Sequence, residues 1–287
     1  MISSSVRDLV REASGIFAQA DLPNAHHEAE WLLAHLLGRA RVHLYLDNPD
    51  VPAATAERFR EMCRARARGV PLQYLIGETE FYGARFFVRS GVFIPRPETE
   101  AIVQNLYEAI RRRGYDSKPL SVIEFGTGSG CIAVTLARLL PACHVLALEV
   151  SYRALTIARK NAEANGVAER VRFVQGRWAE AIRGRADVLV SNPPYVPTPE
   201  VERLPLDVRC EPRMSLDGGP DGMRDLSQLI LESKRLLGPE GLMALECGEE
   251  QVAPLMQLAS LQRIFRRIHP ISDLAGRGRG VLLERGG

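Results

Sequence analysis

From residue 119 onward, short apolar segments typical of buried strands alternate with segments of helical periodicity. Strands are predicted at residues 120–125, 143–150, 171–174, 187–191, 241–247, 263–269 and 280–283. Helices are predicted at residues 131–140, 152–165, 223–237 and 251–261. Strands that alternate with helices build a largely parallel sheet with helices on both faces. This region therefore predicts a doubly wound α/β domain.

The N-terminal seventy residues carry no strand pattern. Apolar residues recur there at helical spacing, and helices are predicted along residues 6–13, 24–37 and 54–68. Asn24 is the expected N-cap of the second helix, and Gly38 its C-terminal stop. Aromatic and β-branched residues broken by glycines then predict a hairpin. The expected organisation is a helical domain (1–71), a β-hairpin linker (72–97) and an α/β domain (98–287).

The charges are balanced, because 37 basic and 35 acidic side chains give a formal net charge of +2. A global field of one sign is therefore not expected. No apolar run reaches the roughly 18 residues of a membrane-spanning helix, and the N-terminus does not resemble a secretory signal. The five cysteines are far apart without a C-x-x-C pair, which fits a reducing compartment. We expect a cytoplasmic protein.

Three histidines, His27, His35 and His43, recur every eight residues. On one helix, neighbouring members would lie about 12 Å apart, too far to share an ion through bonds of about 2 Å. The helix is also expected to end at Gly38, before His43. No metal site is predicted.

A glycine-rich loop, Glu124–Gly130 (E-F-G-T-G-S-G), follows the first strand of the α/β region. Glycines allow close approach to a ligand, and the next helix offers free N–H groups. The spacing is neither that of dinucleotide binders nor that of a P-loop. The second strand ends near Glu149, whose carboxylate can accept both hydroxyls of a ribose. Together they predict a nucleoside-containing ligand, although a tight turn beside an unrelated acid would leave the same pattern.

The segment N-P-P-Y, residues 192–195, directly follows the strand predicted at 187–191. In a doubly wound sheet the first strand lies between the second and the fourth. The glycine loop and Asn192 should therefore meet at the carboxyl edge of the sheet. Asn-Pro also begins ordinary turns, but here the turn falls at a strand end with an aromatic residue beside it.

This segment suits the recognition of an –NH2 group. Asn192 offers an amide oxygen, and Pro193 and Pro194 lack N–H groups, so acceptors are present without competing donors. Tyr195 offers a flat face for a planar group. Holding both hydrogens of a planar –NH2 aims its lone pair at an electrophilic carbon. The prediction is methyl transfer from S-adenosylmethionine to an amide or base nitrogen, without a general base.

With these motifs the sequence resembles class I S-adenosylmethionine-dependent methyltransferases. Three more segments narrow the resemblance: 94–100 (I-P-R-P-E-T-E), 211–222 (E-P-x-x-S-L-D-G-G-x-D-G) and 273–277 (D-L-A-G-R). Along nearly its whole length the sequence is similar to the HemK/PrmC family, the protein-(glutamine-N5) methyltransferases of peptide chain release factors. This resemblance implies a Rossmann-like, seven-stranded, mostly parallel sheet with a small N-terminal helical domain and a connecting β-hairpin.

The resemblance also implies roles for individual residues. The glutamine of the Gly-Gly-Gln motif of class 1 release factors would be bound by Asn192, Pro193, Pro194 and Tyr195, with Asn192, Pro193 and Tyr195 catalytic. S-adenosyl-L-methionine would contact Glu124, Gly126, Thr127, Gly128, Ser129, Gly130, Glu149, Trp178 and Asn192. The family often has an acid directly before the position of Trp178, where this chain has Arg177. The helical domain and the hairpin would grip the release factor, and the enzyme would be a monomer without nucleic-acid or membrane partners.

Three other functions remain open on the sequence. A glutamine methyltransferase of a ribosomal protein would share N-P-P-Y, and so would an adenine-N6 DNA methyltransferase. The latter usually needs a sizeable base-reading region, and the N-terminal seventy residues carry both charge signs without a dense basic stripe. A non-catalytic binding protein could also retain the fold.

Overall fold

The computed structural model describes residues 5–177 and 182–286. The chain divides into two compact units, one formed by Met1–Glu78 with Pro205–Cys210, the other by Thr79–Leu204 with Glu211–Gly287. The predicted linker 72–97 is shared between them, while the predicted three-part division stays a prediction. No helix in the described part of the chain is both long and apolar enough to cross a bilayer.

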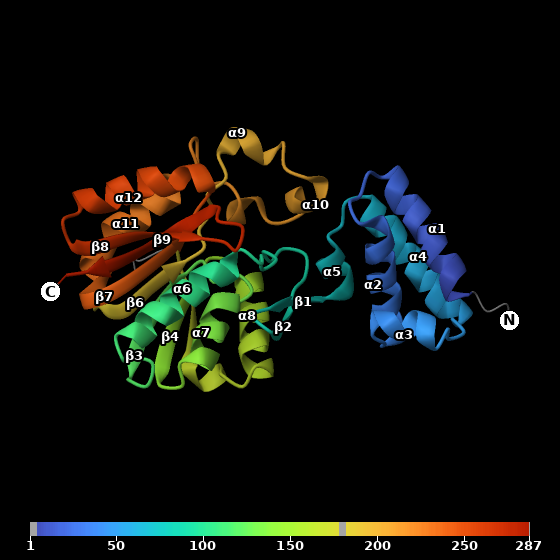
Figure 1. Cartoon of the computed structure of the whole chain (residues 1–287), viewed down its shortest axis with the longest axis horizontal. Coiled ribbons are helices and arrows are strands. Elements are labelled where there is room, and N and C mark those ends of the chain that lie inside the picture. Colours follow the sequence, from blue (N-terminus) through green and yellow to red (C-terminus); the bar gives the residue numbers. More distant parts are fainter. Residues whose placement is uncertain (1–4, 178–181, 287) are drawn as a thin grey trace. The chain divides into compact units, whose positions relative to one another are not determined.

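The first unit is helical (Figure 1). Its helices are α1 (Val6–Gln19), α2 (Ala25–Leu37), α3 (Arg41–Leu46), α4 (Ala53–Ala67), α5 (Leu72–Ile76) and α10 (Leu206–Arg209). The core forms because α1, α2 and α4 each turn an apolar stripe inward, including Phe17, Leu32 and Phe59. A buried arginine, Arg66, pairs with Glu28 at 2.5 Å and with Asp207 at 3.1 Å, and so holds α10 within this unit.

Both predicted ends of α2 (Ala25–Leu37) are confirmed. Gly38 ends α2 in the left-handed conformation, with φ of 62°, as predicted. Asn24 is the N-cap of α2, also as predicted, although its φ is 58° and its side chain makes no capping bond. The helix α3 was not predicted, because its six residues are too short for a clear periodicity.

The second unit is an α/β domain. Its strands are β1 (Glu78–Phe81, which begins at the unit boundary), β2 (Ala84–Phe87), β3 (Leu120–Phe125), β4 (Cys143–Glu149), β5 (Val171–Gln175), β6 (Ala186–Ser191), β7 (Leu237–Glu246), β8 (Phe265–Ser272) and β9 (Gly278–Arg285). Its helices are α6 (Thr99–Arg112), α7 (Cys131–Leu139), α8 (Tyr152–Ala164), α9 (Thr198–Val201), α11 (Arg224–Leu236) and α12 (Val252–Leu261), with single 3-10 turns η1 (Ala168–Arg170), η2 (Arg213–Ser215) and η3 (Glu249–Gln251).

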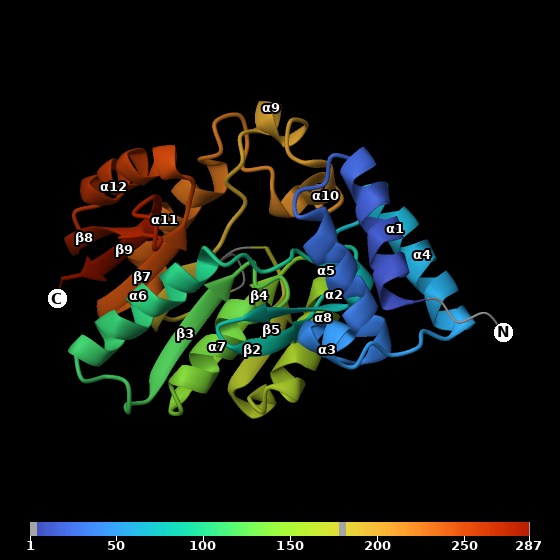
Figure 2. The same ribbon diagram turned by 45° about the vertical axis from the view of Figure 1, so that its right-hand side comes forward.

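The seven-stranded sheet has the order β5-β4-β3-β6-β7-β9-β8. The first five strands in this order are parallel, and β9 runs antiparallel to both of its neighbours. Helices α6, α7 and α8 cover one face, and α11 and α12 cover the other, as Figure 2 shows. This confirms the predicted fold, including the position of β3 between β4 and β6.

The predicted hairpin is shorter than the run of strand-forming residues suggested. Strands β1 and β2 pair with each other, but residues 88–98 contain no strand. Val92 and Ile94 are nevertheless buried. Prolines at 95 and 97 prevent regular pairing, so these apolar residues form a packed loop instead.

Candidate active site

A cavity of about 540 Å³ lies at the carboxyl edge of the sheet, within the second unit. This volume falls in the range of about 300–1,000 Å³ that small-molecule sites occupy. The predicted residues that line it are Glu124, Gly126, Thr127, Gly128, Ser129, Glu149, Asn192 and Pro194. Gly130, Pro193 and Tyr195 belong to the same loops without forming its lining, and Trp178 lies outside the described residues.

The glycine loop turns tightly from β3 into α7. Gly128 has a φ of 55°, a left-handed conformation that a side chain disfavours. The loop is held against β4, because the N–H of Thr127 donates to the carbonyl oxygen of Leu148 at 2.9 Å. The loop therefore presents its backbone to the cavity in a fixed conformation.

Glu149 is oriented by backbone donors at the end of β4. Its Oε2 accepts the N–H of Gly128 and its Oε1 that of Ser151, each at 2.9 Å. Carboxylate oxygens have further lone pairs, and Glu149 lines the cavity. The carboxylate is therefore prepared to accept hydroxyl donors from a ligand such as a ribose.

Glu124 is a buried acid in the wall of the cavity, 1% exposed. Burial raises its pKa to about 8, although the hydroxyl of Thr127 and the N–H of Ala133 donate to the carboxylate and lower it in part. A glutamate commonly has a pKa near 4.5, so Glu124 retains its proton in the folded protein up to neutral pH.

This shift makes stability depend on pH. Between about pH 5 and 8 the folded chain holds a proton that unfolded Glu124 releases, so the free energy of unfolding falls as pH rises, by up to about 1.4 kcal/mol per pH unit. We expect Glu124→Gln to reduce the drop in melting temperature between pH 5.5 and 8.5 by several degrees. Thermal unfolding of the ligand-free protein at the two pH values measures this drop. The control is Glu163→Gln, at an exposed glutamate. Equal drops in melting temperature for both variants would contradict the raised pKa of Glu124.

The two motifs predicted to meet do so. Ser191 is in register with Phe125, and its hydroxyl donates to the Phe125 carbonyl oxygen at 2.7 Å. Asn192 therefore begins its turn beside the start of the glycine loop, and its Nδ2 donates to Oγ1 of Thr99 at 3.2 Å. The glycine loop, Glu149 and Asn192 thus line one cavity.

The hydroxyl end of Tyr195 is held by a neighbouring acid, while the predicted role of its ring as a flat face for the substrate stays a prediction. Its hydroxyl donates to Oε1 of Glu246 at 3.2 Å. Burial and the Glu246 carboxyl both raise the pKa of this hydroxyl well above its ordinary range. This bond joins the N-P-P-Y turn to the end of β7.

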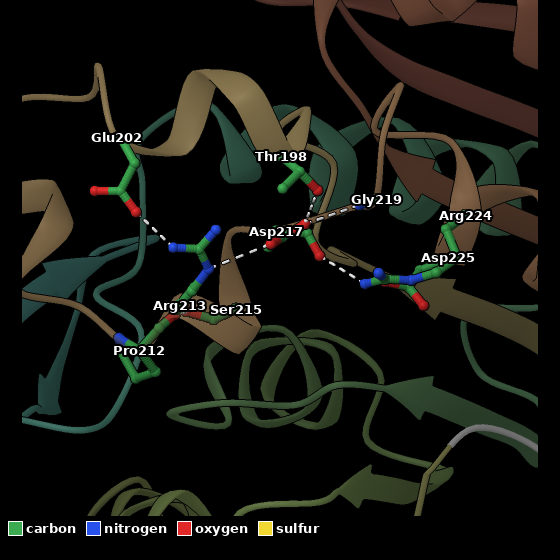
Figure 3. Close-up of polar contacts among 9 residues, drawn as sticks. All are labelled: Thr198, Glu202, Pro212, Arg213, Ser215, Asp217, Gly219, Arg224 and Asp225. Carbon is green, nitrogen blue, oxygen red and sulfur yellow. Dashed lines mark hydrogen bonds and ion pairs between the residues drawn. The ribbon is translucent and has the colours of Figure 1, made fainter.

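The segment 211–222 folds around Asp217 (Figure 3). The carboxylate of Asp217 accepts the hydroxyl of Thr198 at 2.6 Å, the N–H of Gly219 at 3.0 Å and Nε of Arg213 at 3.3 Å. These bonds lower the pKa of Asp217, the hydroxyl of Thr198 most of all. In addition, Arg224 donates to the backbone carbonyl of Asp217 at 2.7 Å.

This segment also supports the N-P-P-Y turn directly. The N–H of Gly218 donates to the carbonyl oxygen of Val196 at 2.9 Å. A Cβ on Gly218 would lie 2.7 Å from the carbonyl oxygen of Pro194, so only glycine permits this approach. The segment therefore holds the backbone that follows Asn192 in place.

A second support joins segments 94–100 and 211–222. Glu211 is buried, accepts the N–H of Ile94 at 2.8 Å and pairs with Arg96. The guanidinium of Arg96 lies over the ring of Phe93 at 5.1 Å, and Phe93 lines the cavity. The two segments thus form one wall of the cavity.

The sequence analysis did not single out several residues that lie at the cavity. Four of them line it, Phe93, Thr99, Asp217 and Asp225, and a fifth, Glu246, accepts the hydroxyl of Tyr195. Glu246 ends β7, the neighbour of β6. The rule that carboxyl ends of parallel strands meet at one edge, already applied to Glu149, could have found it. Among the described residues no group of three or more His, Cys, Asp or Glu is placed to hold a metal ion.

Two family models match separate parts of the chain. Residues 8–77 match the family model described as PrmC N-terminal domain, and residues 86–203 match the methyltransferase small domain. Release factor glutamine methyltransferase from Moorella thermoacetica is 41% identical over 284 residues, covering 98% of this chain and 99% of that protein. The chain belongs to the release factor glutamine methyltransferase family.

A second member of the release factor glutamine methyltransferase family, from Chlorobaculum tepidum, is 39% identical, with 96% of each chain covered. A solved structure with the same fold is the T. thermophilus 16S rRNA N2 G1207 methyltransferase in complex with AdoMet and guanosine. Its TM-score is 0.51 and its identity 20%, over 72% of this chain and 49% of that one. The family resemblance read from the sequence is thus confirmed.

Proposed function

We propose that this chain transfers a methyl group from S-adenosyl-L-methionine to the side-chain amide nitrogen of the glutamine in the Gly-Gly-Gln motif of class 1 peptide chain release factors. The observation that carries the proposal is the position of Asn192, whose amide lines the same cavity as the glycine loop and Glu149. Membership of the family supports the choice of substrate.

The cavity fits the cofactor. Glu149 would bind the ribose hydroxyls, because two backbone N–H groups already orient its carboxylate. The loop of Gly126, Thr127, Gly128, Ser129 and Gly130, with Glu124 behind it, would hold the methionine part. Trp178 beside the adenine, next to Arg177, remains a prediction. When bound, the cofactor supplies an electrophilic methyl group.

The residues around Asn192 would position the nucleophile. Oδ1 of Asn192 and the carbonyl oxygen of Pro193 would each accept one hydrogen of the substrate amide, and neither proline can offer a competing N–H. Two fixed acceptors favour the pyramidal nitrogen of the transition state over the planar ground state. As the amide nitrogen accepts the methyl group, the bond between that methyl and the cofactor sulfur would break. The nitrogen would release one proton to water as or after its new bond forms, so no general base is required.

We propose that the helical unit and the hairpin bind the release factor, and that the enzyme is a cytoplasmic monomer without a stable nucleic-acid or membrane partner. The near balance of 37 basic and 35 acidic side chains supports the exclusion of nucleic acid.

A labelled-methyl transfer assay tests the function. Purified release factor 1 should accept label, whereas its Gln→Asn variant in the Gly-Gly-Gln motif should not. Label on an adenine-containing duplex alone would assign the chain to DNA modification, and label on ribosomal protein alone to the related glutamine methyltransferases. Cofactor binding without any transfer would favour a binding protein.

A further inference from the structure

Asp225 is a buried acid that lines the cavity and has one oxygen without a hydrogen-bond partner. It lies in the first turn of α11 and is 1% exposed. Its Oδ1 is buried and accepts no hydrogen bond from any of the described residues. Thr135 and Glu246 also have a buried atom of this kind, but neither lines the cavity. Because a buried carboxylate oxygen without a donor is costly, Asp225 is suited to a donor that a ligand brings.

Arg224 holds the carboxylate of Asp225 in one orientation (Figure 3). Nη2 of Arg224 donates to Oδ2 of Asp225 at 3.1 Å and to the carbonyl oxygen of Asp217 at 2.7 Å. Gly219 leaves room for this arginine, since a Cβ at position 219 would lie only 3.0 Å from the Cβ of Arg224. The guanidinium therefore occupies Oδ2, and Oδ1 is the oxygen left for a ligand.

The backbone places Asp225 on the N-P-P-Y side of the cavity. The N–H of Arg224 donates to the carbonyl oxygen of Gly218 at 3.0 Å. Gly218 packs against the N-P-P-Y turn, because a Cβ on it would lie 2.7 Å from the carbonyl oxygen of Pro194. Glu149, in contrast, ends β4, which is separated from β6 by β3. Asp225 thus belongs to the part of the cavity where the substrate amide would bind.

The proposed substrate has few donors that could meet this oxygen. Glycine has no side-chain donor, and the glutamine side chain has a single –NH2 group. Both hydrogens of that group would be held by Asn192 and Pro193. The main-chain N–H groups of the tripeptide are then the donors that remain.

We propose that Oδ1 of Asp225 accepts a main-chain N–H group of the Gly-Gly-Gln tripeptide. This inference rests on the proposed function and adds a source of specificity to it. Glycine has no side chain to hinder the close approach of a buried carboxylate to its backbone. A proline in place of the donating residue would have no N–H to offer, so the contact selects the backbone around the glutamine as well as its amide.

The first test replaces the donor in the substrate. Native release factor 1 is compared with three forms, in each of which one main-chain N–H of the tripeptide is replaced by an ester oxygen. Calorimetry with enzyme saturated with S-adenosylhomocysteine gives the Kd of each form. One ester should raise the Kd for the wild-type enzyme roughly 10- to 100-fold, the effect of one hydrogen bond to a charged group. With Asp225→Ala, the native factor and that ester form should bind equally weakly, within about twofold.

The second test uses Asp225→Asn, which is closer in shape to the native residue than alanine is. Because Arg224 can only donate, it would bind the single carboxamide oxygen and turn the –NH2 toward the substrate N–H. We therefore expect Asp225→Asn to bind native release factor 1 no better than Asp225→Ala does. A role in folding alone predicts the opposite order, with asparagine the milder change.

Glu232→Ala is the matched control. Glu232 pairs with Arg235 at 2.8 Å on the same helix and does not line the cavity. This variant should bind native release factor 1 as the wild type does. The Kd for S-adenosylhomocysteine should stay within about twofold in all three variants. A clear rise of that Kd in Asp225→Ala would assign Oδ1 to the cofactor and overturn the inference.

Binding is measured without turnover, so this inference and the proposed function can fail separately. A wild-type enzyme that binds native release factor 1 but transfers no methyl group to it would refute the proposed function alone. Equal Kd values of native release factor 1 for the wild type and Asp225→Ala would overturn the role of Asp225. Ester forms that all bind the wild type as tightly as the native factor would overturn it too.

Discussion

Asn192→Ala should lower turnover by about 100- to 1,000-fold while the affinity for S-adenosylhomocysteine stays within several-fold. The loss is large because the variant removes an acceptor aimed at the reacting nitrogen, and groups of this kind typically contribute 10²–10³-fold. Cofactor binding survives, because the glycine loop and Glu149 are held by bonds to β4 and not by Asn192.

The measurement combines single-turnover methyl transfer to release factor 1 with calorimetry. Asn105→Ala serves as control, since the amide of Asn105 donates within its own helix, to the carbonyl oxygen of Ala101 at 2.9 Å. Substantial activity in Asn192→Ala would eliminate the acceptor role. A parallel loss of cofactor affinity would instead point to a disturbed loop.

Gly128→Val should weaken cofactor binding by at least about 100-fold. A Cβ at position 128 would meet only the Cβ of Phe93, at 3.9 Å. Steric overlap with the protein itself is therefore not the reason for the weaker binding. The φ of 55° is costly for a β-branched residue. In addition, the side chain would occupy the cavity that Gly128 lines and disturb the bond from its N–H to Glu149.

A matched glycine separates backbone strain from blockage of the cavity. Gly114 has a similar φ of 65° and nothing within 4 Å of a Cβ, and it lies outside the lining. Gly114→Val should lower the melting temperature without changing the Kd by calorimetry. Unchanged cofactor affinity in Gly128→Val would refute the role of the loop.

The sequence predicted those parts of the site that follow from chain order. Glu149 and Asn192 each come directly after an apolar strand, and the doubly wound topology places those strand ends beside β3. The positions of Glu149 and Asn192 follow from the order of the strands alone. The roles assigned to Pro193 and Tyr195 stay predictions.

The rest of the cavity wall depends on contacts between residues far apart in the chain. Thr99 and Asn192 are 93 positions apart, and Ile94 and Glu211 are 117 apart. A single sequence gives no sign of which hydroxyl or carboxylate will complete such a pair. The irregular backbone at 88–98 was likewise missed, because buried apolar residues look alike in a strand and in a packed loop.

The position of β9 has a consequence for synthesis of the chain on the ribosome. Although β9 is made after β8, it lies between β7 and β8 in the sheet. Until it emerges, β7 has one unpaired edge and β8 has no neighbour, and such edges invite association with other chains. The nascent domain thus has unpaired strand edges that are prone to association. These edges become paired only after residues 278–285 have left the exit tunnel.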